Sequence, residues 1–209
     1  MRFVAQSKYY IPLFFMFFTL SFCKAARGQG ENSNSIKYYQ LRACKLTFKF
    51  SNGLQEGDKV LIFNDSGVFE KVHVYAHALN KSLNGDSVVA ALTKNEVTVL
   101  MIKTPKSVYT IDLKSKKGRK EHRSPVLWGN ESAFLKKRLI GEDTVLGRLC
   151  DVYECDGGFK VWYWKGIALR KEMVIDGTPV FERIMAIDEH YLIKKDEFAV
   201  PIGVALQDH

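Results

Sequence analysis

Hydrophobic and polar residues alternate in short runs along most of the chain, and turn-forming residues separate the runs. Successive side chains of a β-strand point to opposite faces, so this period of two predicts strands. Ser51-Asn52-Gly53 and Asn64-Asp65-Ser66-Gly67 supply two of the turns. The strands expected in the first half cover residues 45–50, 58–63, 68–75, 87–92, 97–102 and 108–113.

The second half shows one helical signal and then further strands. Asn130 can cap a short helix, Lys137 and Arg138 suit its C-terminal end, and Gly141 can stop it. Asp176-Gly177 is a strong signal for a hairpin turn. The strands expected around this turn and after the helix cover residues 144–154, 161–165, 167–175, 180–187 and 198–204.

This order of elements predicts a mainly β fold of the α+β class. We expect a large curved antiparallel sheet, or an open half-barrel, with one or two short helices. The chain has 209 residues, 46% of them hydrophobic, which is enough for the core of a single domain. We expect that domain to cover residues 45–209, after a loose lead-in and first strand over residues 26–44.

The N-terminus has the pattern of a secretory signal peptide. A basic start is followed by the apolar run Tyr9–Phe22, which is shorter than the roughly 20 residues that span a bilayer. Small residues then allow cleavage after Ala25 or Gly28, so residues 1–25 are predicted to be the signal peptide. An uncleaved anchor is the alternative. These features predict an exported protein, which we expect in the periplasm.

A lipid anchor at Cys23 is disfavoured, because the residue before it, Phe22, is large. After cleavage the chain keeps a mild excess of basic residues, which does not indicate a nucleic-acid-binding protein. We interpret the densest basic run as a solvated turn, with peripheral contact to an anionic membrane or a partner as the alternative. The basic residues of that run are Lys114, Lys116, Lys117, Arg119 and Lys120.

Three cysteines lie beyond the predicted signal peptide: Cys44, Cys150 and Cys155. Five residues of strand span about 16 Å, whereas a disulfide needs Cα atoms within about 7 Å. Cys150 and Cys155 are therefore not expected to pair, and whether Cys44 pairs with either is left open. The C-x₄-C spacing indicates neither a zinc site nor a thioredoxin-type redox site.

Aromatic residues gather around the second and third of these cysteines. If a two-residue loop at Asp156-Gly157 or Gly157-Gly158 joins the flanking strands, Tyr153 shares a face with Trp162 and Trp164. Tyr153, Trp162 and Trp164 are then candidates to line a binding cavity, with membership of an ordinary core as the alternative.

The sequence offers little for catalysis. It contains no G-x-S-x-G or H-E-x-x-H motif and no glycine-rich phosphate loop. His73 and His77 share a face of an extended strand, but two histidines alone are a weak metal signal. We therefore expect a protein that is not an enzyme and that carries no cofactor or metal.

Several phrases together resemble a known family. They are residues 58–67 (DKVLIFNDSG), 107–113 (SVYTIDL), 144–154 (TVLGRLCDVYE), 160–172 (KVWYWKGIALRKE) and 198–204 (FAVPIGV). They are similar to uncharacterised bacterial periplasmic proteins related to the LolA/LolB lipoprotein-carrier fold. The resemblance implies a half-barrel with a hydrophobic concave face covered by helices. In the carriers that cavity takes the acyl chains of lipoproteins.

Two functions follow from these observations. The first is an exported, non-enzymatic protein that binds an acyl chain, lipid or lipoprotein in the concave face of its sheet. The second is a cell-envelope interaction or sensor module whose curve is filled by its own side chains and whose partner is another protein. An open apolar trough favours the first function, and a filled one favours the second.

Overall fold

The computed structural model describes residues 38–84, 87–123, 137–175 and 177–208, and it describes no side chains between residues 80 and 95. The described residues all belong to one compact unit of the chain. Among the described residues, no helix is long and apolar enough to cross a membrane.

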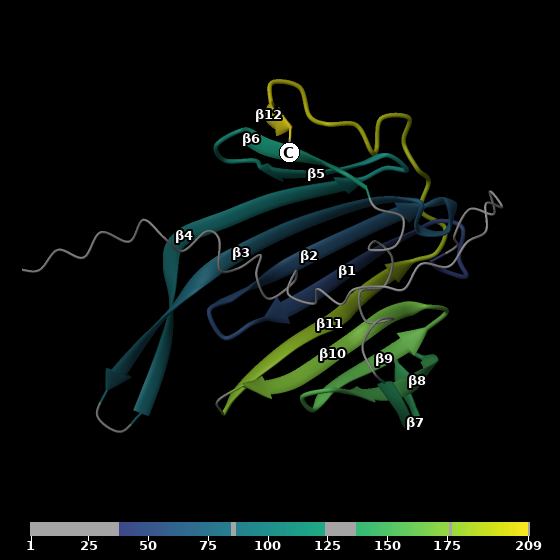
Figure 1. Ribbon diagram of the computed structural model, residues 1–209. Coiled ribbons are helices and arrows are strands. Elements are labelled where there is room, and N and C mark those ends of the chain that lie inside the picture. Colours follow the sequence, from purple (N-terminus) through teal and green to yellow (C-terminus); the bar gives the residue numbers. More distant parts are fainter. Residues whose placement is uncertain (1–37, 85–86, 124–136, 176, 209) are drawn as a thin grey trace, which may run out of the picture. The chain divides into compact units, whose positions relative to one another are not determined.

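The described residues form one large, curved and open β-sheet (Figure 1). Its strands are β1 (Cys44–Ser51), β2 (Gln55–Asn64), β3 (Phe69–Asn84), β4 (Ser87–Lys103), β5 (Ser107–Asp112), β6 (Lys117–His122), β7 (Lys137–Val145), β8 (Arg148–Cys155), β9 (Phe159–Trp164), β10 (Ile167–Ile175), β11 (Thr178–Asp188) and β12 (Ala205–Asp208). The predicted mainly β fold is confirmed.

The strand order is β12-β6-β5-β4-β3-β2-β1-β11-β10-β9-β8-β7. Two meanders, β1–β6 and β7–β11, are thus joined where β1 pairs with β11. Every pair is antiparallel except β12 and β6, which are parallel. Strands β3 and β4 continue their pairing to Asn84 and Ser87, beyond the last residue that pairs with β2 (Figure 1).

Tight turns join the strands of the second meander. At Leu146-Gly147 and Lys165-Gly166 both residues have positive φ, between 47° and 80°, and the flanking strands pair directly. These are two-residue turns of the kind that matches the twist of a hairpin. The predicted hairpin at Asp176-Gly177 is confirmed by the pairing of Ile175 with Thr178.

The predicted helix is wrong where the structure describes it. Lys137, Arg138 and Gly141 lie in β7, which pairs with β8, and the rest of the predicted helix falls outside the described residues. The strands expected over residues 144–154 belong to β7 and β8, and the Leu146-Gly147 turn between them was not predicted. Backbone pairing along β8 outweighs a helical signal that rested on capping and charge.

Three further expectations need correction. Residues 198–204 do not form a strand: Phe198, Val200 and Val204 instead pack against the buried residues of β4 and β5. The basic run is not a single turn, because Lys117, Arg119 and Lys120 belong to β6. Within the described part, the only helical element is a 3-10 turn at Asp65–Gly67, so the expected helical cover is not seen there.

The largest apolar cluster fills one side of the curve. It joins residues of β1 and β2 to residues of β8–β11, although β2 and β8 are not neighbours in the sheet. The sheet therefore curls until these strands share one core. The buried members are Cys44, Leu46, Phe48, Leu61, Phe63, Cys150, Val152, Trp162, Ile167, Leu169 and Ile184.

Candidate functional site

The β8–β9 hairpin separates the predicted site residues onto two faces. Tyr153 pairs with Val161, and Val152 pairs with Trp162. Cross-strand partners lie on the same face of a sheet. Tyr153 therefore lies on one face of the sheet, and Trp162 and Trp164 lie on the other. The predicted grouping of the three residues is therefore wrong.

The cause of this error is the loop that joins β8 to β9. Cys155 pairs with Phe159, which leaves a loop of three residues, Asp156-Gly157-Gly158, where two were assumed. One additional residue reverses the parity of the register and moves every side chain to the other face. Gly157 and Gly158 have positive φ, of 82° and 76°. Glycine adopts this left-handed conformation without steric cost, which allows the longer loop.

Trp162 is only 6% exposed and belongs to the main core cluster. Its indole N–H donates a hydrogen bond of 2.9 Å to Oδ2 of Asp143 on β7. That bond holds the pKa of the Asp143 carboxyl below its usual range. The guanidinium of Arg170 lies 4.3 Å from the centroid of the Trp162 ring. Both the ring and its polar atom are therefore occupied by contacts within the chain.

Trp164 is half-buried against the same cluster and is flanked by two cations. The guanidinium of Arg148 lies 5.0 Å from the ring centroid, and Nζ of Lys165 lies 4.7 Å from it. Glu189 pairs with both cations, at 2.7 Å from Arg148 and 3.8 Å from Lys165. The hydrogen bond from Arg148 lowers the pKa of Glu189. The Trp164 ring, its two cations and Glu189 thus contact one another within the same chain.

Tyr153 belongs to a smaller cluster on the other face of β8 and β9. It packs edge-on against Tyr163, with ring centroids 5.8 Å apart. The ammonium of Lys137 lies 4.8 Å from the Tyr153 ring and 4.9 Å from the Tyr163 ring. Burial raises the pKa of the Tyr163 hydroxyl well above its ordinary value.

The three described cysteines are free, buried thiols. Cys44 and Cys150 lie in the main cluster and Cys155 in the smaller one, so the question of pairing left open by the sequence is answered against a disulfide. Burial raises the pKa of Cys44 to about 11 and raises that of Cys150 and Cys155 as well. These thiols are poor nucleophiles at neutral pH.

A buried ion pair crosses the middle of the sheet. Glu182 on β11 is 8% exposed and pairs with Lys59 on β2 and, at 3.4 Å, with Lys171 on β10. Burial alone would raise the pKa of Glu182, but the two ammonium groups outweigh it and lower that pKa to about 2. The Lys59 ammonium also lies 4.4 Å from the Phe48 ring centroid. The two ammonium groups thus keep the buried Glu182 carboxylate in its charged form.

The basic run is partly neutralised. Arg119 pairs with Glu121 at 2.8 Å, and Lys120 pairs with Asp208 of β12 at 3.5 Å. Lys114 and Lys116 lie in the turn before β6.

His73 on β3 does not form a metal site with other described residues. Nε2 of His73 is buried without a hydrogen-bond partner, but no group of three or more metal-ligating side chains is found among the described residues.

The described sheet ends at two exposed strands, β12 and β7, and β7 is the longer of the two. All residues of β7 except Val145 are exposed, including Leu139 (56%) and Ile140 (43%). In the described part of the chain β7 is the last strand in the order, so its outer edge pairs with no other described strand. Two more exposed apolar residues, Leu146 and Leu149, follow in the turn and in β8. This site was not predicted from the sequence, because part of β7 was assigned to a helix.

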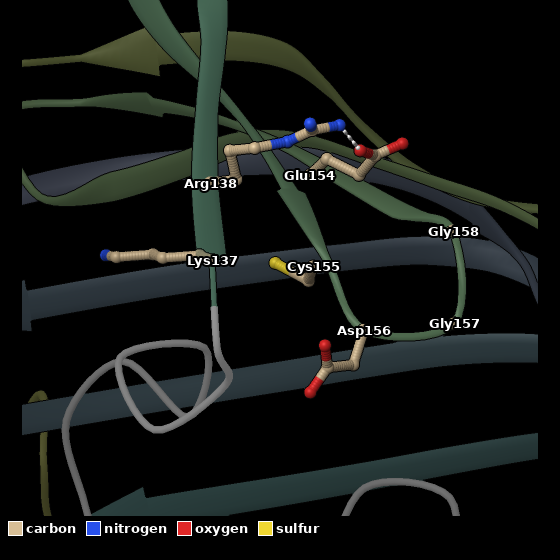
Figure 2. Close-up of a pocket in the computed structure, with 7 residues that line it drawn as sticks. All are labelled: Lys137, Arg138, Glu154, Cys155, Asp156, Gly157 and Gly158. Atoms are coloured by element: carbon tan, nitrogen blue, oxygen red, sulfur yellow. Dashed lines mark hydrogen bonds and ion pairs between the residues drawn. The ribbon is translucent and has the colours of Figure 1, made fainter.

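A shallow pocket of about 430 Å³ lies beside the beginning of β7. Figure 2 shows Arg138 reaching across to Glu154 on β8, at 2.5 Å, whereas Lys137 points to the other side. The pocket is polar and lacks the apolar lining that an acyl chain needs. Its lining residues are Lys137, Arg138, Glu154, Cys155, Asp156, Gly157 and Gly158.

Comparison with solved structures supports the fold. The chain is similar to an uncharacterized conserved protein from Thermus thermophilus, with 10% identity and a TM-score of 0.54 over 81% of this chain and 92% of that one. MucB in complex with MucA(peri), and the Pseudomonas aeruginosa MucA/MucB complex, also match, each with 13% identity and a TM-score of 0.41. These two matches cover 72% and 76% of this chain and 51% and 56% of the others. No family model and no curated protein matches the chain.

Proposed function

We propose that this chain is an exported, non-enzymatic protein that binds another protein through the edge strand β7. The observation that carries this proposal is the exposed outer edge of β7 at the end of the described sheet. An edge strand presents unpaired N–H and C=O groups, which can pair with an added strand of a partner. Leu139 and Ile140 add exposed apolar contacts beside these backbone groups.

The side chains inside the curve of the sheet are already in contact with one another, which also favours a protein partner over a ligand bound there. Trp162 and Trp164, two of the three residues expected to line a cavity, contact core side chains, cations and carboxylates of the same chain. A ligand in the curve would have to displace these contacts. A protein partner at β7 would leave them intact.

Export and a periplasmic location belong to the proposal. They rest on the basic start, the Tyr9–Phe22 apolar run and the small residues near Ala25. The resemblance to periplasmic proteins of the LolA/LolB type points to the same compartment.

Binding of an acyl chain within the curve is the second candidate. The apolar side chains shared by β1, β2 and β8–β11 favour it, because such a surface would take an aliphatic chain if the core opened. Burial of each CH₂ would contribute about 0.8 kcal/mol.

Site-specific photocrosslinking in intact cells tests the proposal. A photoreactive phenylalanine analogue replaces Ile140 on β7, and in a matched control it replaces Leu192, an exposed residue beyond β11. We expect a protein crosslink from position 140 and none from position 192. No crosslink from position 140, or equal crosslinks from both positions, would contradict binding at β7.

A further inference from the structure

We propose that the partner at the β7 edge is a second copy of the same chain, paired antiparallel to β7 about a two-fold axis between Ile140 and Gly141. This inference rests on the proposed function and names its partner. It follows from the register of β7 and from the charges that this register places along the edge.

The register contains a bulge. Leu139 pairs with Tyr153, and Gly141 pairs with Val152, so Ile140 is an additional residue on β7. Gly141 has a φ of 153°, in the region that favours glycine. Side chains therefore resume their alternation after Ile140 with the opposite parity.

The bulge places opposite charges on one face. Arg138 pairs with Glu154, and Asp143 pairs with Cys150. Glu154 and Cys150 are four residues apart on β8 and so share a face, which means that Arg138 and Asp143 also share a face. In a regular strand, residues five apart would lie on opposite faces.

This arrangement is complementary to itself. In an antiparallel pair centred between Ile140 and Gly141, Arg138 of each copy lies opposite Asp143 of the other, and both residues are on the same face. The pair thus contains two cross-strand ion pairs related by symmetry. A closed two-fold interface uses the same patch on both copies, which fits a surface of this kind.

Arg138 and Asp143 can form these ion pairs between copies while keeping the contacts that they make within one copy. The Arg138 side chain is 76% exposed and binds Glu154 through one nitrogen, while a guanidinium has five N–H donors. Asp143 is exposed, and hydrogen bonds from the Trp162 indole and the Thr144 backbone N–H hold its carboxylate in place. The same pairing covers Leu139 and Ile140, which are exposed in the single copy.

Charge reversal provides the test, read by sedimentation velocity of the chain purified as the cell exports it. The unaltered chain is expected to form dimers that dissociate on dilution and at high salt. Arg138→Glu alone and Asp143→Lys alone should each be monomeric, because each places like charges opposite one another. An equimolar mixture of the two variants should form a heterodimer, since both of its ion pairs are then attractive.

A cysteine variant leaves both charged residues in place. Ile140→Cys lies beside the two-fold axis, so mild oxidation should give a disulfide-linked dimer, whereas Leu192→Cys, also at an exposed position, should not. The native thiols are buried and do not compete. Circular dichroism checks that the charge variants remain folded, and the Ile140→Cys result stands even if Asp143→Lys does not fold.

An unaltered chain that stays monomeric at every concentration would overturn the inference. In that case the bulge and the charges serve only to protect the edge from aggregation. If position 140 then still crosslinks to a different protein, the proposed function stands and the inference fails. If it crosslinks to nothing, both fail.

Discussion

Arg138 and Asp143 lie on the same face of β7, although five positions separate them along the chain. Their partners on β8, Glu154 and Cys150, are four positions apart, and the difference is the bulge at Ile140. This relationship turns an exposed edge into a patch that carries opposite charges at a fixed spacing. The surface that we propose as the binding site depends on it.

Trp162 should behave as a core residue. Trp162→Ala should lower the free energy of unfolding by about 3–5 kcal/mol, the usual cost of removing a buried aromatic side chain. Trp164→Ala should cost less, because Trp164 is only half-buried. Urea denaturation of both variants measures this difference, and a Trp162 variant as stable as the unaltered chain would contradict its placement in the core.

The chain should lose stability in acid through Glu182. The folded pKa of about 2 is below the ordinary value of 4.5, so the unfolded state binds the proton first as pH falls. The contribution of Glu182 is present above pH 4.5 and is lost between 4.5 and about 2. Urea midpoints measured across this range should fall more steeply for the unaltered chain than for Glu182→Gln. Parallel curves would contradict the assignment.

Gly57 on β2 should tolerate no side chain. A Cβ at this position would lie 1.9 Å from the backbone oxygen of Tyr75 on β3, so Gly57→Ala must separate the two strands. We expect a loss of about 3–5 kcal/mol of stability. The control is Gly158→Ala, where a Cβ meets nothing but φ is 76°, and where about 1–2 kcal/mol is expected. Equal losses in thermal unfolding would contradict the close approach of β2 and β3.

The cysteines should be unreactive in the folded protein. Cys44, Cys150 and Cys155 are buried, and burial raises the pKa of each. Alkylation at about pH 8, near the ordinary pKa of a free thiol, should be slow in buffer and fast in urea, with all three thiols modified after unfolding. A thiol that reacts at once in buffer, or one that remains blocked in urea until a reductant is added, would contradict free buried thiols.

The strands could be predicted from the sequence because alternation and turn residues are local signals. Residues 45–50, 167–175 and 180–187 form strands as expected. Leu146-Gly147 was missed, because leucine at positive φ is rare and gives no turn signal. The faces of Tyr153 and Trp162 were misassigned because loop length, which sets register, is fixed by pairing between strands.

The site at the β7 edge could not be predicted from the sequence for a related reason. Its charges look unordered along the sequence, and only the bulge opposite Tyr153 and Val152 brings Arg138 and Asp143 to one face. A bulge depends on the partner strand and leaves little trace in the residues that form it.

Native mass spectrometry of the exported chain, purified without detergent, tests the central claim most directly. If β7 binds protein and the curve is filled by Trp162, Trp164 and their neighbours, the spectrum should contain protein assemblies that Arg138→Glu disrupts. No adduct of lipid mass should accompany them. A lipid adduct that persists through purification on a chain without any protein partner would contradict the account. It would favour the second candidate function, binding of an acyl chain within the curve.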